Sequence, residues 1–158
     1  MQRAAMVALK AVLVVIFLIL LFGQVLVIPL FASDTAAFYP ELAYLRWPGV
    51  AYSIAVVICV QIALVGIWML LSMVSRDAIF RPSAFRVVDV IIGCTVVATV
   101  LVAVGFPVLV VTGAMNPGLM IMIFTTVVAG LAVALLLIVM RALLVKATEL
   151  EHDLAEVV

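Results

Sequence analysis

Long stretches without a charged residue are the feature that most restricts what this chain can fold into. Three such stretches lie between Lys10 and Asp34, between Arg46 and Arg76, and from Val90 to Met140. A helix needs about 20 apolar residues to cross a hydrocarbon core of about 30 Å. Each stretch is therefore long enough to span a membrane, and the third is too long for a single crossing.

A predicted turn divides the third stretch. The segment TGAMNPG at 112–118 contains two glycines, an asparagine and a proline, residues that favour tight turns. We therefore expect four spans, at about 11–32, 49–74, 85–111 and 117–144. The run at 11–32 is longer than the apolar region of a signal peptide, which covers about 7–15 residues, so we interpret it as a span. With 70% hydrophobic and 10% charged residues, the chain predicts an all-α polytopic membrane protein, an antiparallel four-helix bundle in one domain over 1–158.

Basic residues predict how the bundle is oriented. Lysine and arginine close to a span are retained in the cytoplasm. Only Arg46 falls on one side of the four-span topology, whereas seven basic residues fall on the other: Arg3, Lys10, Arg76, Arg81, Arg86, Arg141 and Lys146. We therefore expect a plasma-membrane protein with both termini and the hairpin at 75–91 in the cytoplasm.

The predicted outer loop, 33–49, is rich in aromatic residues. Phe38, Tyr39, Tyr44 and Trp47 lie in it, and Tyr52 follows at the start of the next span. Amphipathic rings favour the headgroup level, so a membrane-interface belt is the favoured interpretation, and an outward-facing binding surface is the alternative. Pro40 is placed to begin a short helix and Pro48 to end it.

Few polar side chains lie within the spans. Gln24, Gln61, Thr95 and Thr99 form a candidate intramembrane polar cluster, in which Gln61 and Thr99 lie at a depth that permits a hydrogen bond. One interpretation is a set of clamps between helices, and the other is a small polar cavity. The clamp is favoured because no charged group lies at mid-membrane.

Asp89 lies about one turn inside the third span. Arg86 precedes it by three residues, a spacing that predicts an ion pair along one helix. A proton relay through Asp89 is disfavoured, because an arginine that reaches toward the interface would keep the carboxylate hydrated.

Small residues and prolines predict local features of the helices. Thr126, Gly130 and Ala134 recur every four residues in the fourth span, a spacing that permits close helix packing, within the monomer or between two copies. Pro29 and Pro107 lie inside apolar runs, and each is expected to kink its helix.

The C-terminal segment RALLVKATELEHDLAEVV predicts an amphipathic helix that continues the fourth span at about 145–158. Its apolar residues recur at alternating spacings of four and three, whereas acidic residues occupy the other faces. The acidic residues of this helix disfavour binding to an anionic leaflet. If its apolar face is buried, it would therefore be buried against protein. A solvated helix without a specific contact is the alternative. The candidate partner-binding residues are Arg76, Arg81, Arg86, Leu143, Leu150 and Leu154.

The sequence contains no recognisable motif for catalysis or metal binding. His152 is the single histidine, and Cys59 and Cys94 lie in different spans. We expect no enzymatic activity, no cofactor, no metal and no direct binding of nucleic acid.

Three segments resemble a known family: LLSMVSRDAIFRPSAFRVVDVI around the hairpin, LLFGQVLVIPL in the first span and YPELAYLRWP in the outer loop. They are similar to bacterial membrane proteins described as domain of unknown function 2975, in particular the actinobacterial ones. The resemblance implies a small four-helix protein of the bacterial inner membrane without an assigned activity. Many such proteins look to be encoded beside a small helix-turn-helix regulator.

Two functions remain open at this point. The first is a regulatory or accessory protein that binds a protein partner, or a second copy, through the cytoplasmic hairpin and acidic tail. The alternative is a protein that binds or transports a small molecule or lipid through the polar residues inside the bundle. Membrane lipid surrounds the protein in both cases.

Overall fold

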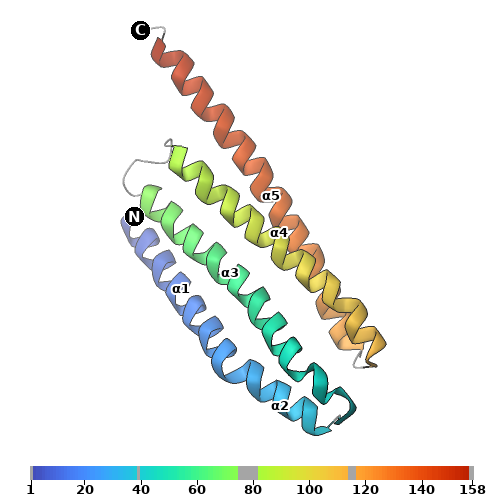
Figure 1. Cartoon of the computed structure of the whole chain (residues 1–158). Coiled ribbons are helices and arrows are strands. Elements are labelled where there is room, and N and C mark those ends of the chain that lie inside the picture. Colours follow the sequence, from blue (N-terminus) through green and yellow to red (C-terminus); the bar gives the residue numbers. More distant parts are fainter. Residues whose placement is uncertain (1, 39, 75–81, 114–116, 157–158) are drawn as a thin grey trace.

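The computed structural model describes residues 2–38, 40–74, 82–113 and 117–156. Helices account for almost all of them, and no strand occurs in these four ranges. Figure 1 shows the elements in order: α1 (Gln2–Phe22), the π-helical turn η1 (Gly23–Val27), α2 (Ile28–Phe38), the 3-10 helix η2 (Pro40–Leu45), α3 (Arg46–Val74), α4 (Pro82–Val111) and α5 (Pro117–Glu156).

Four membrane-spanning segments follow from these helices. They cover Met6–Ala37, Ala43–Met73, Ala84–Val111 and Pro117–Thr148, each with a mean hydropathy of at least 2.6. The first span is built from α1, η1 and α2 together, and each of the other three contains one long helix. The all-α, four-span fold predicted from the sequence is confirmed.

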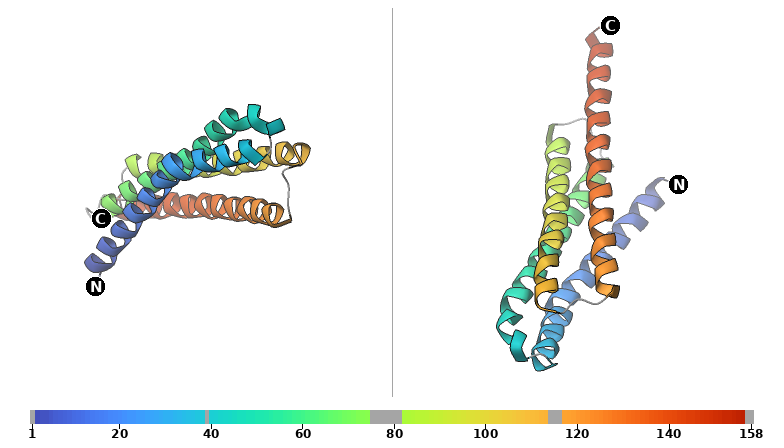
Figure 2. Two further views of the ribbon diagram at one scale, coloured as in Figure 1. Left: turned by 90° about the horizontal axis from the view of Figure 1, so that it is seen from below. Right: turned by 90° about the vertical axis from the view of Figure 1, so that its right-hand side faces the viewer.

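The helices pack in a row that follows their order in the chain. The extensive contacts join α1 and α2 to α3, α3 to α4, and α4 to α5. Figure 2 shows α5 displaced to one side of α4, so the row is not flat. Both termini lie at one end of the molecule, here named the termini end, and η2 lies at the opposite, loop end (Figure 1). Consecutive spans therefore run antiparallel (Figure 1).

Few side chains are buried within the chain itself. Among the described residues, the buried apolar ones are Leu13, Ala84, Ile91 and Ala134. Most leucines, valines and isoleucines of the spans are instead exposed on the outer surface of the row. Such a surface is stable in hydrocarbon, where the apolar side chains contact lipid tails that are as apolar as they are.

Prolines begin three of the helical elements. Pro40, Pro82 and Pro117 are the first residues of η2, α4 and α5. A proline at this position costs nothing, since its missing N–H would have no partner within the helix. The prediction that Pro40 opens a short helix is confirmed.

The prediction that Pro48 ends that helix is wrong. Pro48 lies in the first turn of α3, which begins at Arg46. The first-turn N–H groups make no bond within a helix, so proline is tolerated there as well. Most of the segment predicted as the outer loop is helical, because α2 continues to Phe38 and η2 follows; Tyr39 lies outside the described residues.

Two glycines bring neighbouring helices close together. A Cβ atom added to Gly66 of α3 would lie 2.6 Å from Cγ1 of Ile91 on α4. One added to Gly130 of α5 would meet Thr99 of α4, and Ala134, one turn later, is 3% exposed. The small-residue pattern of α5 therefore packs within the chain at these two positions, whereas Thr126 is exposed.

The first span changes its helical geometry in the middle. Ile28 donates its N–H to the carbonyl of Gly23, five residues earlier, as in a π-helix. Pro29 follows immediately and has no N–H to donate. The direction of the ribbon changes between α1 and α2 (Figure 1), where the sequence predicted a kink.

Candidate functional site

A pair of buried amides joins the first and second spans. Gln24 of η1 is 9% exposed, and Gln61 of α3 is 8% exposed. The Gln61 side chain donates a hydrogen bond from Nε2 to Oε1 of Gln24 over 3.0 Å. Both residues lie near the middle of their spans, Met6–Ala37 and Ala43–Met73. A hydrogen bond at this depth binds α3 to the first span, because hydrocarbon offers neither amide another partner.

The π-helical turn explains how Gln24 reaches this place. A π-helical turn inserts one extra residue into a helix and rotates the side chains that follow relative to those that precede. The residues on either side of Gln24, Gly23 and Val25, are half-buried and exposed, so the amide is directed inward from an otherwise lipid-facing segment.

The candidate polar cluster is divided by the structure. Thr95 and Thr99 of α4 donate to carbonyls of their own helix, Ile91 and Thr95 respectively, each over 2.8 Å. The hydrogen bond considered between Gln61 and Thr99 does not form, because Gln61 binds Gln24. Thr99 lies where α4 meets α5, against Gly130.

Asp89 of α4 forms an ion pair with Arg141 of α5. The guanidinium group uses two nitrogens: Nε binds Oδ1, and Nη2 binds Oδ2 over 3.1 Å. Both side chains are partly exposed, 47% for Asp89 and 40% for Arg141. The prediction that Asp89 pairs with Arg86 is wrong. The reason is that Asp89 points toward the neighbouring helix, where a planar guanidinium can bind both carboxylate oxygens.

Part of the candidate partner-binding set lies within the described residues. Arg86 is exposed on α4, and Leu143 is 57% exposed on α5. Leu150 and Leu154 lie in α5, but the structure does not describe their side chains. Arg76 and Arg81 lie outside the described residues. The amphipathic character of the tail therefore stays a prediction from the sequence.

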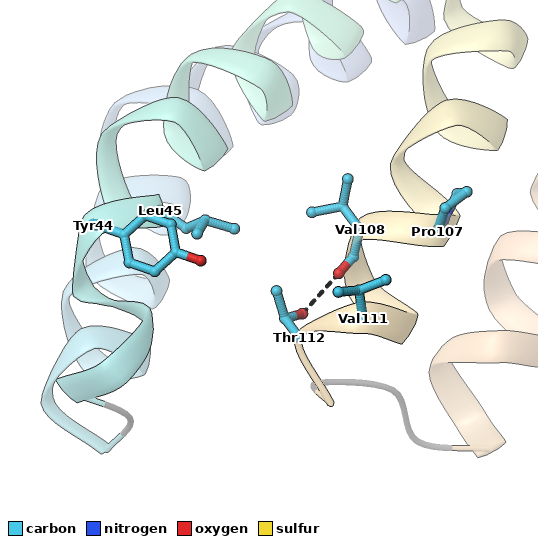
Figure 3. A pocket seen from close by; sticks show the side chains of 6 residues that line it. All are labelled: Tyr44, Leu45, Pro107, Val108, Val111 and Thr112. Carbon is cyan, nitrogen blue, oxygen red and sulfur yellow. Dashed lines mark hydrogen bonds between the residues drawn. The ribbon is translucent and has the colours of Figure 1, made fainter.

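A groove of about 340 Å³ opens at the loop end between η2 and the end of α4. Figure 3 shows Tyr44 and Leu45 on one side, facing Val108 and Thr112 on the other, with Pro107 and Val111 beside them. The Thr112 hydroxyl donates to the carbonyl of Val108, so the groove lining is almost entirely apolar. Tyr44 and Trp47 are each 74% exposed at this end, as a membrane-interface belt requires.

Two aromatic contacts between helices were not predicted. The Tyr52 hydroxyl of α3 donates to the carbonyl of Leu101 on α4, and its ring lies against Gly105. Near the termini end, the Lys10 ammonium lies 5.6 Å from the centre of the Trp68 ring. The sequence contained a partial signal only for the Tyr52 contact, because Gly105 has no side chain and leaves room for a ring.

Groups that could hold a metal ion are not found among the described histidine, cysteine, aspartate and glutamate side chains. Cys59 and Cys94, on α3 and α4, are free thiols. The polar contacts between helices described above are the amide pair, the ion pair, the Tyr52 hydroxyl bond and the Lys10–Trp68 contact.

Four apolar helices that pack on one another define a multi-pass α-helical membrane protein. A sequence model described as protein of unknown function (DUF2975) matches residues 30–158, and the chain belongs to this family. It is also 26% identical over 155 residues to the uncharacterized membrane protein YoaS of Bacillus subtilis (strain 168), an alignment that covers 97% of each chain. No solved structure matches. The family resemblance seen in the sequence is confirmed.

Proposed function

We propose that this protein is a non-enzymatic regulatory or accessory subunit of the bacterial inner membrane, with both termini in the cytoplasm. Its hairpin and acidic tail bind a protein partner. The observation that carries the proposal is the length of α5, which continues past the other helices at the termini end (Figure 1).

The projection of α5 follows from the helix lengths. α4 has 30 residues and α5 has 40, and α4 ends and α5 begins at the loop end (Figure 1). At 1.5 Å per residue, the ten additional residues extend α5 by about 15 Å. The extension contains the acidic tail, so this segment is presented beyond the membrane domain as a continuous helix.

The ion pair supports a defined position for this helix. Arg141 lies 24 residues after Pro117, about 36 Å along α5, close to the membrane boundary at the termini end. Its two bonds to Asp89 bind α5 to α4 just before the extension begins. A tail held in this way is preorganised for binding, which lowers the entropy lost when a partner docks.

The charges of the tail indicate what kind of partner fits. Glu149, Glu151, Asp153 and Glu156 are acidic, whereas Leu150 and Leu154 are four residues apart. Anionic headgroups repel such a helix. A protein groove with an apolar floor and a basic rim would bind it in the manner of other amphipathic helices.

Orientation is the first point to test. In a variant without Cys59 and Cys94, a cysteine at His152 should react with a membrane-impermeant maleimide only after the cells are opened. A cysteine at Pro40, which is exposed in η2 between the first two spans, should react in intact cells. The reverse pattern would place the tail outside the cell and contradict the proposal.

Partner binding is tested by extracting the native protein gently from its own membrane and determining the mass of the intact assembly. We expect a stoichiometric protein partner that is lost when Leu150 and Leu154 are both replaced by alanine, a change that preserves helix propensity. His152→Ala, on another face of the helix, is the matched control and should retain the partner. Extraction without any partner, or a partner that survives deletion of 148–158, would refute the proposal.

A further inference from the structure

One buried polar atom of the described membrane domain has no hydrogen-bond partner. It is Nε2 of Gln24, the amide nitrogen beside the oxygen that accepts from Gln61. The atom is shielded from the surface of the row, so it cannot be satisfied at the membrane boundary. A buried donor without an acceptor is costly, and in native structures such a group usually indicates a bound water or ligand.

A backbone acceptor without its usual donor occurs in the same turn. Pro29 has no N–H, so the carbonyl four residues earlier, that of Val25, receives no bond from it. An ordered water often satisfies backbone groups that proline leaves unpaired in membrane helices. In the π-helical turn the unpaired amide donor of Gln24 therefore lies one residue before a carbonyl that Pro29 cannot bond.

The surroundings allow only an uncharged group. The run 11–33 and the run 47–75 contain no charged residue, so an ion at this depth would have no counter-charge on either span. Lipid ester groups lie at the interface, whereas Gln24 is 13 residues, or about 20 Å of helix, from Ala37 at the end of its span. An uncharged oxygen that accepts a hydrogen bond from the Gln24 amide satisfies this unpaired donor.

We infer that Gln24 of the π-helical turn and Gln61 of α3 form a binding site at mid-membrane for one uncharged oxygen group. This oxygen belongs to a water molecule or to the hydroxyl of a small molecule dissolved in the membrane. Gln61 holds the Gln24 amide in place by its bond to Oε1, which leaves Nε2 as the binding donor. The site lies within the spans and is independent of partner binding by the tail.

The composition of the chain permits a direct measurement. The sequence contains three glutamines, Gln2, Gln24 and Gln61. A protein labelled with ¹⁵N only in glutamine side chains therefore gives three amide pairs by NMR in deuterated lipid nanodiscs. The variants Gln2→Ala and Gln61→Met each lose one pair of amide signals, which assigns all three pairs. The inference itself is tested on the wild-type protein.

The two sources of the oxygen give different results. Magnetisation transfer from water protons to the Gln24 amide, and not to the Gln61 amide, identifies a bound water. Transfer from protons of a co-purified molecule instead, which disappears after reconstitution in synthetic lipid, identifies a membrane-dissolved ligand. Either result supports the site.

Two results would overturn it. The Gln24 amide protons could show contact with the Gln61 side-chain oxygen, in which case the two amides satisfy each other in a reciprocal pair. They could also show transfer from neither water nor any co-purified molecule. In both cases no oxygen group is bound at this turn.

Discussion

Replacing Gly130 by alanine tests how closely α4 and α5 approach each other. The added Cβ would meet the hydroxyl of Thr99 and lie 3.2 Å from both Cβ and Cγ2 of that residue. Thr99 cannot simply rotate away, because its hydroxyl donates to the carbonyl of Thr95 over 2.8 Å. The two helices must therefore separate, or this hydrogen bond must break.

The magnitude follows from two opposing effects. Overpacking of a close contact costs about 1–3 kcal/mol. Removing a glycine from a helix interior gains up to about 1 kcal/mol. Gly93→Ala on α4 is the matched control, because nothing lies within 4 Å of its added Cβ and only the gain remains. The free energy of unfolding should thus be lower for Gly130→Ala than for Gly93→Ala by about 1–3 kcal/mol.

Reversible unfolding in mixed micelles, followed by circular dichroism, measures this difference. Adding Thr99→Ala to Gly130→Ala removes Oγ1 and Cγ2, two of the three close atoms, so the double variant should recover most of the loss in a double-mutant cycle. Equal stabilities for Gly130→Ala and Gly93→Ala would refute the close approach. An additive double variant would show that Thr99 is not the residue in contact.

Two further predictions concern the polar contacts between helices. Asp89→Asn and Arg141→Gln should each lower the melting temperature of the protein in detergent, whereas exchanging the two residues should restore most of it; failure of both single variants to destabilise would contradict the ion pair. Tyr52→Phe keeps the ring against Gly105 but removes the bond to the Leu101 carbonyl. We expect a loss of about 1 kcal/mol in the same unfolding assay, and an unchanged stability would contradict that bond.

The number and extent of the spans could be predicted because the length of the uncharged runs decides them. Uncharged runs long enough to cross hydrocarbon must be helical, since the membrane satisfies no backbone group. The start of η2 at Pro40 could also be predicted locally, because proline is favoured at the first position of a helix. Pro48 was misjudged because a proline that ends one helical element and one that lies in the first turn of the next look alike in sequence.

Pairs between helices were harder to predict. Polar residues could be identified as needing partners, but several partners lay at a suitable depth. Gln61 had two candidate partners, Gln24 and Thr99. Choosing between them requires knowing which face of α3 packs on α4, the face on which Gly66 lies against Ile91. Asp89 likewise had Arg86 nearby in sequence, whereas Arg141 became available only when α5 packed beside α4.

The row of helices has a consequence for how the protein is made. Since the extensive contacts join each span to its neighbours in the chain, a newly inserted span finds one of its partners already in the bilayer. Contacts between chain neighbours form quickly, because little loop entropy is lost in closing them. α5 is then the last span to dock, and the helical extension at its end takes its final place only when the other three are assembled.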